Sequence, residues 1–163
     1  MKKAEVIQNK ILDASSLTRR LALWRLQNKK IVFTNGCFDL LHLGHIDYLG
    51  KAKDLGDILV VGVNTDNSVK RLNKGSNRPI TNQLSRTTLM AALLFVDAVV
   101  LFDEDTPYQL IKTIQPDVLV KGSDYKPEDI VGYDVVMAKK GEIKTLDFLE
   151  GYSTTAIENK IRE

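Results

Sequence analysis

The sequence of 163 residues contains one cysteine, four prolines and few aromatic residues, which make up 7% of the chain. A single cysteine excludes an internal disulfide, so stability must come from a packed core, as in proteins of a reducing compartment. No apolar run approaches the roughly 18–20 residues that span a bilayer, and the first residues lack the apolar core of a signal peptide. The 23 basic and 21 acidic side chains form neither a basic stripe nor a charged tail. We therefore expect a soluble, cytoplasmic protein with no nucleic-acid or membrane partner.

The length and the 44% hydrophobic content fit a single domain preceded by a short leader. Residues 1–29 carry apolar side chains at helical spacing, interrupted at Ser15 and Ser16, which are candidate helix caps. The pattern predicts an N-terminal helical leader over residues 1–29. Its simplest role is to cover the domain that follows, residues 30–163, or to form a contact between copies of the chain.

From Lys30 onward, short apolar runs alternate with amphipathic stretches of helical length. Strands that are apolar on both faces are typical of a parallel sheet covered by helices on each side. The sequence therefore predicts an α/β fold, a Rossmann-like doubly wound parallel sheet of about five strands, with ligands beyond the carboxyl ends of the strands. The predicted strands are 31–33, 58–63, 98–102, 118–120 and, more weakly, 143–146; the predicted helices are 44–55, 84–95, 106–115 and 133–140.

The loop after the first strand of this domain contains His42 and His45, the only two histidines in the chain. Three interpretations compete. With Cys37 they could bind a metal ion, although no CxxC or HExxH pattern and no carboxylate cluster supplies further ligands. Cys37 could instead be a nucleophile activated by an imidazole, which requires an exposed thiol of lowered pKa.

The third interpretation is a site that binds a polyphosphate, and the loop favours it. Gly36 and Gly44 allow close approach of the backbone to a ligand, and the first turn of a helix offers free N–H groups to an anion. His42 and His45 can donate hydrogen bonds to phosphate oxygens there. The loop contains neither GxGxxG nor a Walker motif, which indicates a different phosphate chemistry.

The tetrad 42–45 resembles the HxGH signature of the nucleotidyltransferase superfamily, which includes cytidylyltransferases and phosphopantetheine adenylyltransferases. Three further blocks, at 63–72, 120–128 and 151–155, are similar in order to those of the heptose 1-phosphate adenylyltransferase domains of ADP-heptose synthases. The resemblance covers residues 28–162 and identifies 30–163 as a nucleotidyltransferase domain. It implies the free-standing form, without the sugar-kinase domain to which this unit is fused in some bacteria.

The resemblance implies transfer of AMP from ATP to a sugar 1-phosphate, D-glycero-D-manno-heptose 1-phosphate, with release of pyrophosphate. The attacking phosphate oxygen is already ionised at neutral pH, so the reaction needs positioning and charge stabilisation and no general base. ATP is the co-substrate, and Mg²⁺ is expected to be held mainly by substrate phosphates. Relatives also suggest a homodimer.

By the same resemblance, His42 and His45 hold the triphosphate and stabilise the transition state at the α-phosphorus. Lys74 or Arg78 supplies a mobile cation that bridges the phosphates of the two substrates, and Arg86 a fixed one. The choice between Lys74 and Arg78 stays open, and a charge run such as 70–79 is in many proteins only a solvated face.

The nucleotide site implied by the resemblance draws on the loops after three strands and on a hydroxyl block before the last helix. Asp39 and Tyr125 are expected to face the sugar phosphate, and no residue is assigned to a metal. Simpler roles compete: Phe38 as core, 121–125 as an ordinary turn and Ser153 as a helix cap. The expected nucleotide-binding residues are Thr34, Asn35, Gly36, Cys37, Phe38, Gly44, Lys121, Gly122, Asp124, Ser153, Thr154 and Thr155.

Two other functions compete with adenylyl transfer to a sugar phosphate. One is a cytidylyltransferase acting on glycerol 3-phosphate; against it, related cytidylyltransferases carry basic residues before the hydroxyl block, where this chain has 148–151, Phe-Leu-Glu-Gly. The other, from a different class, is a non-catalytic nucleotide-binding module that regulates a partner.

Overall fold

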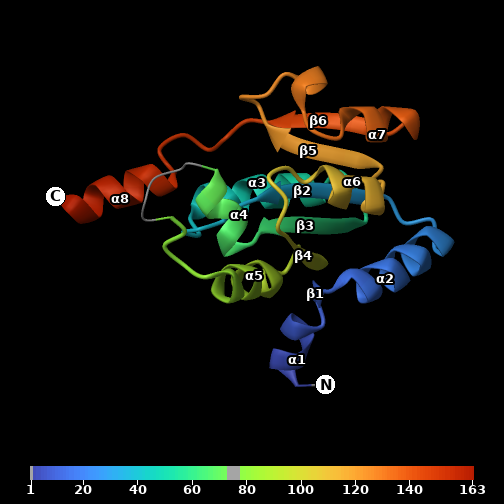
Figure 1. Cartoon of the computed structure of the whole chain (residues 1–163), viewed down its shortest axis with the longest axis horizontal. Coiled ribbons are helices and arrows are strands. Elements are labelled where there is room, and N and C mark those ends of the chain that lie inside the picture. Colours follow the sequence, from blue (N-terminus) through green and yellow to red (C-terminus); the bar gives the residue numbers. More distant parts are fainter. Residues whose placement is uncertain (1, 73–77) are drawn as a thin grey trace.

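The computed structural model describes residues 2–72 and 78–163. The chain alternates strands and helices from residue 3 to residue 162 (Figure 1). The elements in order are α1 (Lys3–Gln8), β1 (Ile11–Leu12), α2 (Ala14–Leu26), β2 (Ile31–Gly36), α3 (Leu43–Lys53), β3 (Ile58–Asn64), α4 (Asp66–Arg71), α5 (Gln83–Ala92), β4 (Ala98–Phe102), α6 (Tyr108–Ile114), β5 (Val118–Gly122), a 3₁₀ turn (Pro127–Asp129), α7 (Tyr133–Ala138), β6 (Glu142–Leu146) and α8 (Thr154–Arg162).

The strands form one parallel sheet in the order β1-β4-β3-β2-β5-β6. This confirms the α/β fold and the five predicted strands. The sheet has a sixth strand because the leader is not wholly helical. Ile11 and Leu12 pair with Val99 and Val100 of β4. A strand of two apolar residues is too short to show the alternation typical of strands, and its neighbours in the leader have helical spacing. The leader thus contributes one edge of the sheet.

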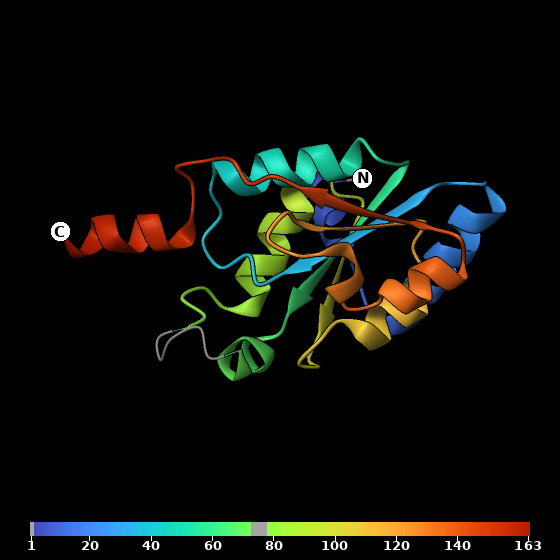
Figure 2. The ribbon, with the colours of Figure 1, turned by 90° about the horizontal axis from the view of Figure 1, so that it is seen from above.

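Apolar side chains on both faces of the strands account for two core layers. Phe33 faces the layer formed with α2, α6 and α7, whereas Val32 faces the layer formed with α3 and α5, the alternation expected along a strand. Figure 2 shows α3 on one side of the sheet and α6 and α7 on the other. Helices on both faces are what the continuous apolar strands require.

The direction in which strands are added reverses between β2 and β5. From β2 the chain proceeds to β3 and β4 on one side, then returns to place β5 and β6 on the other. In open α/β sheets such a switch point creates the crevice where ligands bind, beyond the carboxyl ends of the strands. This places the loops after Gly36 and Gly122 at the expected site.

Helix caps explain where several helices begin. The second helix is capped by Asp13, whose side chain accepts a hydrogen bond from Ser16 N (2.7 Å), so the expectation that Ser15 or Ser16 is the cap is wrong. A carboxylate can accept from a first-turn N–H as a serine does, and Asp13 precedes both serines. Ser153 caps α8, the simpler of the two roles considered for it, and accepts from Ala156 N at 3.0 Å.

Two further features concern the surface. The C-terminal helix α8 projects away from the body of the molecule in both views (Figures 1 and 2). Among the described residues, none of the helices combines the length and apolar character needed to cross a membrane.

Candidate active site

The N-terminus of α3 lies where the sequence predicts an anion-binding element. His42 is the N-cap residue, with an extended backbone, and its side chain makes no capping hydrogen bond. Its carbonyl oxygen accepts from the N–H of His45 at 3.0 Å. Because no side chain in the described part of the chain caps this 11-residue helix, its first N–H groups and its positive dipole end are left for a ligand.

The two imidazoles stack on each other at this helix end. Their ring centroids are 3.8 Å apart with 26° between planes, and Phe38 meets His45 edge-on at 5.4 Å. Nδ1 of each histidine is buried and has no hydrogen-bond partner among the described residues. Buried polar atoms usually have partners, so a ligand or an ordered water beside these rings would satisfy both Nδ1 atoms.

Burial keeps both histidines neutral without a ligand. It lowers the pKa of His42 below its ordinary value, and burial together with the neighbouring His42 lowers the pKa of His45 from 6.5 to about 4. A polyphosphate placed beside the rings would oppose this effect, because a nearby anion favours the protonated form. Nucleotide binding should therefore be coupled to proton uptake at these rings.

This neutral state makes stability depend on pH. The pKa of His45 in the folded state lies below its value in the unfolded state, so the unfolded state takes up a proton first as the pH falls. The stability contributed by the neutral ring is therefore present above about pH 6.5 and is lost as the pH falls toward 4. From neutral pH to about pH 5 we expect the free energy of unfolding to fall by about 2 kcal/mol through His45 alone. Urea unfolding at the two pH values measures this, and His45→Leu should remove most of the slope. If the free energy of unfolding fell equally with pH in His45→Leu and in the wild type, the pH dependence would not come from His45.

Gly44 allows the imidazole of His42 to lie close to the helix backbone. A Cβ at this position would stand 3.0 Å from Nδ1 of His42 and 3.2 Å from the backbone oxygen of Tyr152. The same close approach brings the backbone of Tyr152, next to Ser153, against the start of α3. The segment before α8 therefore meets the helix start that carries the histidines, although 108 positions separate 45 from 153. Contact of the hydroxyls at 153–155 with phosphate stays a prediction.

Gly44→Ala should therefore impair function more than folding. The added methyl group displaces the His42 ring or the chain at Tyr152, and we expect turnover to fall by about 10-fold or more. Gly50→Ala is the matched control, because Gly50 lies in the same helix and its Cβ would meet nothing within 4 Å. It should keep full activity and gain about 0.5–1 kcal/mol of stability. Equal activities of the two variants would contradict this role of Gly44.

Asp39 organises the segment 78–81. Its side chain is only 5% exposed and accepts hydrogen bonds from the backbone N–H groups of Ile80 (2.9 Å) and Thr81 (2.8 Å) and from Nη1 of Arg78 (2.8 Å). Burial by itself raises the pKa of this carboxyl, but the hydrogen bonds from Thr81, Ile80 and Arg78 hold it below its ordinary value. Asp39 is thus ionised and engaged inside the protein, and its contact with a sugar phosphate stays a prediction.

Arg78 lies between two carboxylates. Besides Asp39, it contacts Oε2 of Glu158 on α8 through Nη2, at 2.9 Å. To bridge substrate phosphates, as predicted, its guanidinium would have to exchange at least one of these partners. The alternative bridging cation, Lys74, lies outside the described residues.

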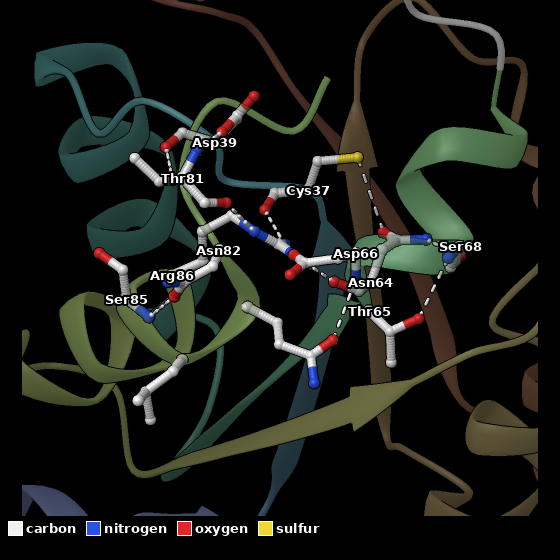
Figure 3. Close-up of polar contacts among 12 residues, drawn as sticks. Cys37, Asp39, Asn64, Thr65, Asp66, Ser68, Thr81, Asn82, Ser85 and Arg86 are labelled. Carbon is white, nitrogen blue, oxygen red and sulfur yellow. Dashed lines mark hydrogen bonds and ion pairs between the residues drawn. The ribbon is translucent and has the colours of Figure 1, made fainter. Parts of the chain in front are cut away.

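Arg86 connects the loops at the carboxyl end of the sheet (Figure 3). Its side chain is fully buried. Nη1 donates to the carbonyl oxygen of Cys37 (2.6 Å), Nη2 donates to the carbonyl oxygen of Asn64 (2.7 Å) and to Asp66 (2.8 Å), and Nε donates to the carbonyl oxygen of Thr81 (3.1 Å). What the structure displays is a cation that fixes three segments; direct contact with phosphate stays a prediction.

The strand ends on either side of the switch point are linked by Lys121. Its ammonium group donates to Oδ1 of Asn35 and lies 6.0 Å from the ring centroid of Tyr125. Gly122, the last residue of β5, has Asp124 and Phe148 packed against it. The predicted nucleotide residues of β2 and β5 therefore share one location, as the topology requires.

Some predicted site residues serve the fold. The hydroxyl of Thr34 is buried and lies 2.9 Å from that of Tyr48. Phe38 has a left-handed backbone conformation (φ 49°) and a buried ring that packs against Gly36 and His45. The Cys37 thiol donates to Oδ1 of Asn64 at 3.8 Å. Within residues 2–72 and 78–163, no group of three or more His, Cys, Asp or Glu side chains could hold a metal ion.

Comparison with known proteins gives the family of the chain. The sequence model of the cytidylyltransferase-like family matches residues 33–160. The chain is 59% identical over 136 residues to bifunctional protein HldE of a Nitratiruptor species, covering 83% of this chain and 28% of that protein. It is 52% identical over 155 residues to bifunctional protein HldE of Wolinella succinogenes, covering 95% of this chain and 32% of that protein. The chain thus spans less than a third of the length of these relatives.

Two solved structures are similar to the chain. A lipopolysaccharide core biosynthesis protein from Thermoplasma volcanium is 31% identical, with a TM-score of 0.60, and the alignment covers 77% of this chain and 99% of that one. The pantoate-beta-alanine ligase from Francisella tularensis, solved with beta-gamma ATP and beta-alanine, is 19% identical with a TM-score of 0.63 over 93% of this chain and 76% of its own. The second likeness shows the fold alone. From the family match and these identities, the chain belongs to the cytidylyltransferase-like family of nucleotidyltransferases.

Proposed function

We propose that the protein transfers AMP from ATP to a sugar 1-phosphate, D-glycero-D-manno-heptose 1-phosphate, and releases pyrophosphate. The observation that carries this proposal is the stacked His42–His45 pair, whose Nδ1 atoms have no partner in the described chain, at an uncapped helix N-terminus beside the switch point. The identities with HldE proteins and with a lipopolysaccharide core biosynthesis protein support a heptose phosphate as acceptor.

The chemistry required is in-line displacement at the α-phosphorus. An oxygen of the sugar phosphate forms a bond to phosphorus, the bond from phosphorus to the oxygen that bridges the α- and β-phosphates breaks, and pyrophosphate leaves with that electron pair. The attacking oxygen is already an anion, so the protein must hold two anions in line and stabilise the charge that develops. Mg²⁺, arriving on the triphosphate, would neutralise part of that charge.

The residues divide this work between the two substrates. The imidazoles and the first N–H groups of α3 would hold the triphosphate, and the hydroxyls of Ser153, Thr154 and Thr155 would hold its far end at the start of α8. Arg78 would approach the acceptor phosphate on release from Glu158. Asp39 keeps the segment that carries Arg78 in place.

The test is pyrophosphate release by the purified protein in the presence of Mg²⁺. ATP with one of the two anomers of heptose 1-phosphate should support turnover, whereas each substrate alone should not. Turnover with CTP and glycerol 3-phosphate, but not with ATP and the heptose phosphate, would replace the proposal by the cytidylyltransferase that the family name suggests. Binding of nucleotide without turnover with any acceptor would indicate a regulatory module.

A further inference from the structure

Phe148 has an exposed aromatic ring held against the carboxyl end of β5. It follows β6 and precedes α8, and it is 59% exposed. On the protein side the contact is close: a Cβ added to Gly122 would stand 2.2 Å from Cζ of the ring. Its plane is 28° from that of Tyr48 on α3, with the centroids 6.0 Å apart. The ring is therefore supported from the protein and open to solvent elsewhere.

This ring lies at the carboxyl end of β5, beside the switch point. Gly122 ends β5, and the neighbouring Lys121 donates a hydrogen bond to Asn35 near the end of β2. Tyr48, which stacks with Phe148, is one helical turn after His45, so its side chain and the imidazole are neighbours on α3. A ligand whose phosphates contact the histidines would therefore have its other end near Phe148.

An aromatic ring that is packed along one side and open on the other can offer its face to a ligand. Ligand sites are lined mainly by apolar and aromatic side chains, with a few polar groups that fix orientation. Every nucleobase has a π-face, and stacking of a base on an aromatic side chain contributes substantially to binding. The ring at Phe148 has the right chemistry and the right place for such a contact.

We propose that Phe148 is the platform on which the base of the nucleotide stacks, and that it favours a purine over a pyrimidine. The inference rests on the proposed function, because it assigns the base end of the same nucleotide. A purine has the larger π-surface, so it gains more from the ring than cytosine does. Gly122 is then required because any side chain there would displace the platform.

The experiment is calorimetric binding of three probes to the wild type and to Phe148→Ala, Phe148→Leu and Phe148→Trp. The probes, each with Mg²⁺, are α,β-methylene-ATP, α,β-methylene-CTP and inorganic tripolyphosphate. Phe148→Ala should weaken binding of the ATP analogue by about 10-fold or more and that of the CTP analogue by less. Tripolyphosphate binding should be unchanged, since it has no base. Phe148→Leu should bind the ATP analogue about as weakly as Phe148→Ala, whereas Phe148→Trp should bind it about as tightly as the wild type.

The outcomes separate this inference from the proposed function. If the wild type binds the ATP analogue and both Phe148→Ala and Phe148→Leu bind it equally well or more tightly, the platform is excluded and the proposed function is untouched. If Phe148→Ala also weakens tripolyphosphate, the residue acts on the whole site and the inference is equally excluded. If the wild type binds neither the analogue nor tripolyphosphate, the proposed function and the platform both fail.

Discussion

Replacing His42 or His45 by alanine should lower kcat for pyrophosphate release by about 100-fold to 1,000-fold, the effect of removing one preorganised donor from a transition state. The rings stack at 3.8 Å, and the proposed function places both on the same phosphate group, so we expect them to act as a unit. The double variant should therefore be little worse than the poorer single variant. Steady-state kinetics with ATP and heptose 1-phosphate measure all three.

Replacing His45 by leucine should not destabilise the protein at low pH. Each ring buries an Nδ1 atom that has no partner in the described chain, and protonation of His45 is disfavoured in the folded state. His45→Leu removes both penalties and should be at least as stable as the wild type at about pH 5. Loss of activity with retained stability identifies a residue kept for function. Loss of both together would mean that the imidazole is part of the core, and full turnover in both single variants would exclude the mechanism.

The parts of the fold that follow from local sequence were predicted correctly. Strands β3 and β4 are continuous apolar runs, and their burial on both faces is the direct consequence of that composition. A cap at Ser153 could be considered beside its predicted nucleotide role because capping depends on atoms only three residues away. The histidine pair was visible because both rings belong to one loop and helix start.

The edge strand and the contacts between loops could not be found in this way. Ile11 and Leu12 become a strand only because the edge of β4 is available, 88 positions further along the chain. The bonds of Asp39 to residues 78–81 depend on loops that meet only after the sheet has formed. The contact between Gly122 and Phe148 likewise joins β5 to the segment after β6.

One missed feature did leave a signal. Arg86 and Met90 are four residues apart on the predicted helix and both are fully buried, so the arginine occupies a position on the core face. An arginine on the apolar face of a helix has to be paired within the protein, because an unpaired buried charge is very unfavourable. That pattern indicates an internal link as much as a cation for phosphate.

Replacing Arg86 by methionine should lower the free energy of unfolding by about 3–5 kcal/mol, the effect of breaking a buried ion pair by removing one partner. The variant keeps a long side chain but leaves the carbonyl oxygens of Cys37, Asn64 and Thr81 and the carboxylate of Asp66 without their donor. Urea unfolding measures the change. Turnover should fall as well, because the loop that carries the histidines begins at Cys37.

Arg71→Met is the matched control, since Arg71 is paired with Asp105 at 2.6 Å but its side chain is 42% exposed. Exposed pairs contribute little, so this variant should lose less than about 1 kcal/mol. Adding Asp66→Asn to Arg86→Met should recover part of the lost stability, because the double variant no longer contains a carboxylate without a partner. We expect the coupling in the double-mutant cycle to exceed about 0.5 kcal/mol. If Arg86→Met instead removed turnover with almost no change in stability, its guanidinium would act on the substrate as the family resemblance implies. Stability measured beside kcat therefore decides between a cation that binds phosphate and one that holds the three loops in position.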